Sequence, residues 1–128
     1  MFKARNVPEK FGARAGTTMS CLIDVPIDPS TARAARITLS TWAGAHADAF
    51  GLNAVKIVDR IGTDDYYSYD SMDFSPKLVK RGENSFYVFS NTQEHHAEVN
   101  WPGPVLLLEF ARSAAKPATG STSPRSIP

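Results

Sequence analysis

The chain has 128 residues, of which 42% are hydrophobic and 21% charged, so its size and composition are those of one globular domain with a single core. Its 14 basic and 13 acidic residues are interspersed and give a net charge of +1, which excludes both the basic stripe of a nucleic-acid-binding protein and the charge block of a membrane-surface protein. The start of the chain lacks the apolar run of a signal peptide, and no segment could span a bilayer. We therefore expect no nucleic-acid or membrane partner. Localisation stays open, and it would be extracellular if the chain is a module of an exported protein.

The N-terminal part of the chain predicts one strand behind a short irregular segment. Residues 1–14 mix charged residues, proline and glycine without a period, and we interpret them as an N-terminal arm or edge segment. Residues 17–25 alternate in polarity, which predicts a half-buried strand. The apolar face of this strand would carry Met19, Cys21, Ile23 and Val25. Because Cys21 is the only cysteine, it cannot form an intrachain disulfide, and we expect it to be a buried small hydrophobe.

The middle of the chain predicts two further strands separated by loops. Residues 35–42 alternate again and form the second predicted strand, and residues 53–58 form the third. Between them, residues 44–51 are a loop of small residues, with a helical turn over 43–50 as the alternative. Residues 64–74 place tyrosines among aspartates, which we interpret as a loop that leads into a strand.

The last two predicted strands are residues 85–90 and 105–110. The turn over 78–84 precedes the first of them, and its Gly82 is free to take a positive φ. In the strand 105–110, Glu109 is charged and should face solvent, so we expect Leu106, Leu108 and Phe110 to face the core.

Short strands separated by turn residues, without a 3.6-residue apolar stripe, predict an all-β fold. We expect an antiparallel β-sandwich of jelly-roll type over residues 15–112. Residues 113–128 are rich in Ala, Ser, Thr and Pro without an apolar period, which predicts a disordered tail or linker. The predicted core contains Ile23, Val25, Ile37, Leu39, Val55, Ile57, Phe86, Val88, Leu106 and Leu108.

The order of several fragments resembles the galactose-binding-like jelly-roll modules that are attached to glycoside hydrolases, polysaccharide lyases and other secreted enzymes. The resemblance covers about residues 17–111, and the matching fragments are residues 24–30, 34–42, 53–57 and 78–84 and the last apolar strand. It implies a module of the carbohydrate-binding type. Members of this family often carry a structural calcium, for which Asp24 and Asp28 would supply oxygen ligands, and we expect no other cofactor.

Five residues are the candidates for carbohydrate binding. Trp101 precedes a rigid Pro-Gly-Pro turn, so its indole is either a preorganised platform for a sugar ring or a cap on the core. Tyr66 and Tyr67 lie among carboxylates and a hydroxyl, where they would flank the sugar or pack across strands. His95 and His96 would form hydrogen bonds with sugar hydroxyls.

The same histidines form a cluster with Glu94 and Glu98 that could bind a divalent metal or carry out acid–base chemistry. The alternative is a solvated loop, since only His46 could supply a third nitrogen ligand. The sequence has no nucleophile elbow, phosphate-binding loop or dinucleotide fingerprint. Catalysis is therefore not indicated.

We expect a non-catalytic accessory module that binds polysaccharide or oligosaccharide and is part of, or derived from, a polysaccharide-active secreted protein. A neighbouring catalytic domain would be a further partner. The alternative is a structural or assembly β-sandwich without a small ligand, which the linker-like residues 113–128 and the apolar run 105–108 favour.

Overall fold

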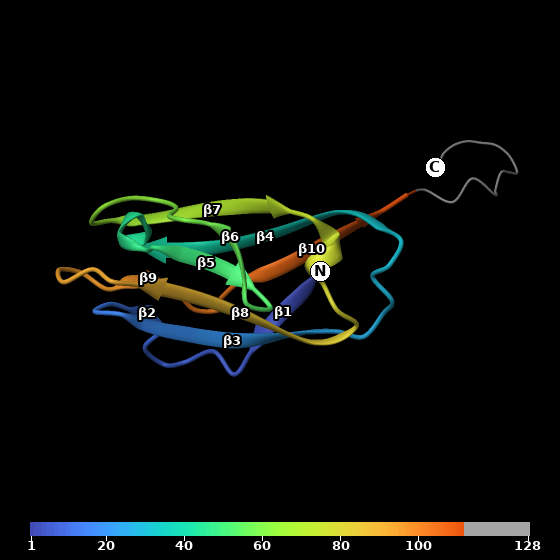
Figure 1. Ribbon diagram of the computed structural model, residues 1–128, viewed down its shortest axis with the longest axis horizontal. Helices are drawn as coiled ribbons and strands as arrows, with labels where there is room; N and C mark the ends of the chain where they lie inside the picture. Colours follow the sequence, from blue (N-terminus) through green and yellow to red (C-terminus); the bar gives the residue numbers. More distant parts are fainter. Residues whose placement is uncertain (112–128) are drawn as a thin grey trace, which may run out of the picture.

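The computed structural model describes residues 1–111 and confirms the predicted antiparallel β-sandwich. The strands run along the long axis of the molecule (Figure 1). They are β1 (Phe2–Arg5), β2 (Gly12–Ala13), β3 (Thr17–Val25), β4 (Ala32–Trp42), β5 (Ala49–Leu52), β6 (Val55–Val58), β7 (Tyr67–Phe74), β8 (Gly82–Ser90), β9 (Ala97–Val99) and β10 (Val105–Phe110), with two short 3-10 turns, η1 (Gly44–His46) and η2 (Pro76–Leu78). The segment 113–128, predicted as a tail or linker, lies outside the described residues.

The strands form two sheets that share β1. The front sheet has the order β1-β3-β8-β5-β6, and the back sheet contains β7-β4-β10-β1, with β9 and β2 continuing beside the end of β4. Phe2 and Lys3 of β1 pair with β10, whereas Ala4 and Arg5 pair with β3. The segment that we interpreted as an N-terminal arm therefore contributes two strands, one of which joins the sheets.

The alternation of β3 and β4 places one face of each strand in the core, as predicted. The fully buried large side chains include Ile23, Val25, Ile37, Leu39, Phe50, Leu52, Phe86, Val88 and Leu106. Cys21 is buried, also as predicted. Ile57 and Leu108 are half-buried and pack against this core. The prediction for Val55 was wrong: its side chain is 44% exposed, because it begins the edge strand β6 beside a tight turn and no strand covers it.

Besides β1 and β2, the strands β5 and β9 were not predicted from the sequence. Residues 49–52, predicted as part of a loop, form β5 between β8 and β6, and the helical turn is limited to η1. Residues 97–99 form β9, which pairs with β2 and with the end of β4. Both strands consist of few residues and contain alanine, so their sequences carry little strand propensity of their own.

A buried amide fixes the turn before β8. Asn84 is completely buried, and its Nδ2 donates hydrogen bonds to the carbonyl oxygens of Lys80 at 2.8 Å and Gly82 at 3.2 Å. Its Oδ1 accepts from the backbone N–H of Lys80 and from Nδ2 of Asn53, both at 2.8 Å. Gly82 has a φ of +96°, as expected for the glycine of this turn. The Asn84 side chain thereby ties the turn to the loop that joins β5 and β6.

The edge strand β7 turns two polar side chains toward the interior. Ser68 and Asp70 lie opposite Thr41 and Leu39, both of which face the core. The Ser68 hydroxyl donates to Oδ2 of Asp70 at 2.6 Å and lies 3.3 Å from the hydroxyl of Thr41. A row of hydrogen-bonded polar groups therefore lines this edge of the back sheet. Within residues 1–111 the structure has no helix with the length and apolarity needed to cross a membrane.

Candidate functional site

Trp101 is a solvent-exposed side chain in the loop between β9 and β10. Its indole is 83% exposed, so it is not the core cap that was the alternative. The backbone around it is fixed by a hydrogen bond from the N–H of Gly103 to the carbonyl oxygen of Asn100 at 2.9 Å. Trp101 lines two neighbouring hollows, one beside β1 and one that also contains His96 and Glu98.

Three of the other predicted residues meet at a different place, beside the end of β4. The rings of Tyr66 and Tyr67 lie 6.0 Å apart in an edge-to-face arrangement, and Tyr67 is the cross-strand partner of Trp42. The His95 ring packs edge-on against Trp42 at 5.3 Å and against His46 at 5.5 Å. We call Trp42, Tyr66, Tyr67 and His95 the aromatic cluster. The sequence analysis did not single out Trp42, its central ring.

The two histidines of the predicted loop therefore have different neighbours. His95 joins the aromatic cluster, whereas His96 lines the hollow beside Trp101. His46, the one possible third nitrogen ligand, meets His95 and not the His96–Glu98 side. In the described part of the chain, no three His, Cys, Asp or Glu side chains converge as they would around a metal ion.

The aspartates considered for calcium are already engaged by the protein. Asp24 accepts hydrogen bonds from the guanidinium of Arg5, which lowers the pKa of its carboxyl group. Asp28 accepts a 2.9 Å hydrogen bond from the backbone N–H of Ser30, and its pKa is lowered for that reason. Calcium binding here would require these contacts to be replaced.

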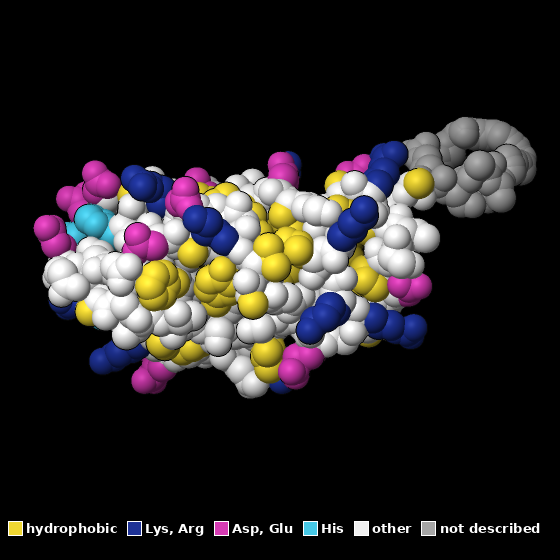
Figure 2. Space-filling view, in the orientation of Figure 1, with side chains coloured by type: hydrophobic (Ala, Val, Ile, Leu, Met, Phe, Trp, Pro, Cys, Tyr) yellow, Lys and Arg dark blue, Asp and Glu magenta, His cyan; other side chains and the backbone are white. Residues whose placement is uncertain are grey.

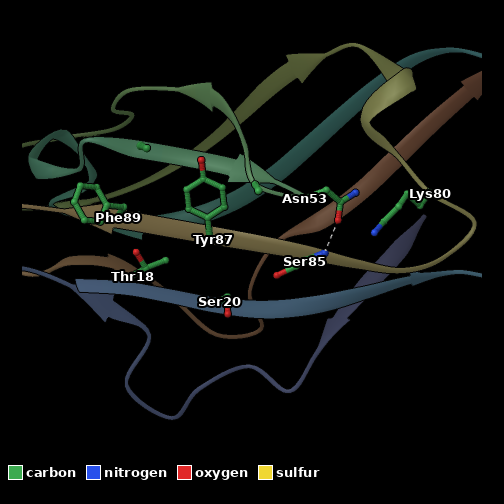
Figure 3. Close-up of a pocket in the computed structure, with 9 residues that line it drawn as sticks. Thr18, Ser20, Asn53, Lys80, Ser85, Tyr87 and Phe89 are labelled. Carbon is green, nitrogen blue, oxygen red and sulfur yellow. Dashed lines mark hydrogen bonds between the residues drawn. The ribbon is translucent and has the colours of Figure 1, made fainter. Parts of the chain in front are cut away.

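A groove of about 710 Å³ runs over the outer face of the front sheet (Figure 3). Phe86 and Val88 of β8 point into the core, so the side chains of Tyr87 and Phe89 stand on the outer face. Figure 2 shows hydrophobic side chains gathered over β5 and β8 in the middle of this face. The groove is lined by Thr18, Ser20, Ala49, Asn53, Ala54, Lys80, Ser85, Tyr87 and Phe89.

The Tyr87 ring lies against Gly51 of the neighbouring strand. Gly51 is its cross-strand partner, and a Cβ atom placed on Gly51 would be 2.5 Å from Cε1 of Tyr87 and would also overlap the carbonyl oxygen of Val55. The cross-strand partners of Tyr87 and Phe89 on the other flank are the short side chains of Ser20 and Thr18. Small neighbours on both flanks therefore leave a shallow, open hollow beside the rings, and the rings form part of its wall.

Polar groups mark one end of the groove. Oδ1 of Asn53 accepts a 2.9 Å hydrogen bond from the backbone N–H of Ser85, which fixes the orientation of the amide (Figure 3). Its Nδ2 donates to the carbonyl oxygen of Leu78 at 2.8 Å. The Lys80 side chain extends over the same end of the sheet (Figure 3). The groove thus combines an aromatic centre with hydroxyl, amide and ammonium groups.

No protein-family model matches the chain, and a search of curated proteins finds no significant match. Among solved structures, the chain is similar to a β-porphyranase of glycoside hydrolase family 86 from the human gut bacterium Bacteroides plebeius. The sequence identity is 13% and the TM-score is 0.59, over 88% of this chain and 20% of that enzyme's chain. The likeness is one of fold. This chain spans about a fifth of the length of its neighbour, and it shares with it an antiparallel β-sandwich.

The sequence contained one signal for the groove that the analysis did not use. Four consecutive apolar residues, 86–89, cannot all face one side of a strand, so with Phe86 and Val88 directed inward the rings of Tyr87 and Phe89 lie on the outer face. The strand β5, which flanks these two rings, was predicted as a loop. Without β5 the sequence analysis could not place the neighbouring residues that form the groove with Tyr87 and Phe89.

Proposed function

We propose that this domain binds a carbohydrate chain in the groove of the front sheet and serves as a non-catalytic accessory module of a polysaccharide-active protein. The observation that carries the proposal is the pair of rings, Tyr87 and Phe89, that forms part of the wall of a hollow between short side chains. The apolar face of a sugar ring packs on an aromatic ring, while its hydroxyls need hydrogen-bonding partners beside that ring. The hydroxyl groups of Ser20 and Ser85 supply such partners here.

The chemistry of the groove supports binding without catalysis. Its lining contains no carboxylate, histidine or cysteine among the described residues, so it lacks the pair of carboxyl groups with which most glycosidases act. Cys21 is no nucleophile, because burial raises the pKa of its thiol to about 12. The proposal includes the jelly-roll, galactose-binding-like character that the sequence suggests, and the fold likeness to a β-porphyranase agrees with a module of this kind.

The first test is affinity gel electrophoresis of the domain against a panel of neutral and acidic polysaccharides. We expect retention by at least one polysaccharide and a loss of affinity of about tenfold in Tyr87→Ala, since an aromatic contact contributes about 1 kcal/mol beyond the area that it buries. Thermal melting of the variant would show that the fold is intact. Absence of retention on every polysaccharide would refute the proposal.

The residues predicted from the sequence provide matched controls. Trp101→Ala and Tyr67→Ala each remove an exposed ring outside the groove, and we expect both variants to be retained like the parent domain. If instead Tyr67→Ala or Trp101→Ala abolished retention and Tyr87→Ala did not, the carbohydrate would bind at the aromatic cluster or beside Trp101. The groove would then not be the site.

A further inference from the structure

We infer that the groove takes an anionic saccharide, one that bears carboxylate or sulfate groups, and that Lys80 binds the anionic group at one end of the groove. This inference rests on the proposed function and names the class of its ligand. The distribution of charged side chains around the rings of Tyr87 and Phe89 supports this inference.

Lys80 is a cation without a carboxylate partner in the part of the chain that the structure describes. Within residues 1–111 its ammonium group takes part in no salt bridge, whereas Arg5, Arg33, Arg36 and Lys56 are each paired with a carboxylate. Its backbone is held on both sides by the buried amide of Asn84, which bonds its N–H and its carbonyl oxygen. The protein therefore fixes where this side chain begins and leaves the ammonium group free for a ligand.

The residues that line the groove differ in charge from those farther from the rings. The described lining of the groove includes no Asp or Glu. Asp24 and Glu83, near the start of β8, are turned to Arg5. A second cation, Lys56, stands in the same cross-strand row as Tyr87, beyond Gly51. The ammonium group of Lys56 is itself paired with Asp59, so Lys80 is the cation of the groove lining that remains for an anion beside Tyr87.

The end of the molecule opposite Lys80 carries negatively charged side chains. Acidic side chains gather around a histidine there (Figure 2), and the loops at this end expose Asp64, Asp65 and Glu94. These carboxylates lie beside the aromatic cluster, close to Tyr66 and His95 in the sequence. An anionic chain would be repelled from that cluster and attracted to the Lys80 end of the groove.

The test compares polysaccharides that share a backbone and differ in charge. The probes are polygalacturonate against its methyl ester, for carboxylates, and carrageenan against chemically desulfated carrageenan, for sulfates. We expect the domain to be retained more strongly by the anionic member of at least one pair. Lys80→Gln should weaken that retention about three- to tenfold, as expected for one partly exposed charge contact, and raising the salt concentration should weaken it further.

Lys77→Gln is the matched control. Lys77 lies three residues before Lys80 and carries the same charge, but its side chain does not line the groove. An equal loss in both variants would mean that only the net charge matters, and it would overturn the inference. Retention of the neutral member as strongly as the anionic one, in both pairs, would also overturn it. If neutral polysaccharides bind through Tyr87 in that case, the proposed function stands without the anionic preference. If no polysaccharide binds at all, both fail.

Discussion

Asn84 is the residue on which the geometry of the groove depends most directly. Its side-chain amide is completely buried and bonds the backbone of Lys80 and the amide of Asn53, two residues that line the groove. A buried polar group of this kind is stabilising only while all its partners are present. Asn84 therefore positions Lys80 and Asn53 without lining the groove itself.

We expect Asn84→Ala to lower the free energy of unfolding by about 3 kcal/mol, because the substitution leaves several buried backbone and amide groups without a partner. Urea denaturation measures this change. Asn91→Ala is the control, since Asn91 is exposed and is expected to change the stability by less than about 0.5 kcal/mol. Equal stabilities of the two variants would contradict the role assigned to Asn84.

At the scale of elements, the strand β5 determines whether the outer face of the front sheet is a groove. It places Gly51 beneath the ring of Tyr87 and Ala49 beside Phe89. Residues with larger side chains at these positions would fill the hollow. The register shift between Phe50 and Gly51 belongs to the same strand, so β5 departs from regular pairing at the point where the ring lies.

Gly51→Ala should therefore destabilise the domain by about 2 kcal/mol and weaken carbohydrate retention, because the new methyl group overlaps the Tyr87 ring and a backbone carbonyl oxygen. Gly82→Ala is a suitable comparison. The substitution is also strained, because Gly82 has a positive φ, but the new Cβ atom has no other atom within 4 Å. We expect Gly82→Ala to lose stability and keep its retention. Parent-like retention in Gly51→Ala would show that the ring does not need this position.

The sequence predicted those elements whose own residues alternate. Residues 17–25 and 105–110 were predicted with the bounds that the structure shows, because the first segment alternates in polarity and the second is a short apolar run that follows a turn. β5 was not predicted, since alanine and glycine carry no strand signal and its position follows from pairing with β8. Of the candidate site, the sequence left open whether single rings such as Tyr66 and Trp101 are exposed, and their grouping depends on the register between strands. The groove combines three strands and escaped prediction for the same reason.

At the scale of the whole molecule, β1 connects the sheets, and exposed ion pairs link neighbouring strands within each sheet. Arg5 binds Asp24 of β3 and Glu83 of β8, so one guanidinium links three strands of the front sheet. Arg36 and Asp73 form a similar cross-strand pair on the back sheet. All these groups are about half-exposed, and such pairs each contribute little to stability.

The hydrogen bonds with Arg5 and Arg36 lower the pKa values of Asp24 and Asp73 in the folded protein. Because the folded pKa is below the unfolded value of about 3.9, this stabilisation is present above that pH and is lost as the pH falls through the lower, folded value. We expect the melting temperature to stay constant between about pH 7 and pH 5 and to decrease below about pH 4. Arg5→Met should flatten part of this decrease, whereas Lys10→Met, at an exposed position without a salt bridge among the described residues, should not. Identical acid profiles for Arg5→Met and the parent protein would contradict this assignment.

The polar row on β7 has a consequence for how copies of this protein behave at high concentration. An edge strand with free backbone groups is a template on which the edge of another molecule can add, and such addition leads to aggregation. The carboxylate of Asp70 points toward the interior side of β7 and is held there by Ser68. A strand from a second molecule would have to enclose this charge between the two sheets, which is costly. We therefore expect Asp70 to disfavour polymerisation through the edge of the back sheet.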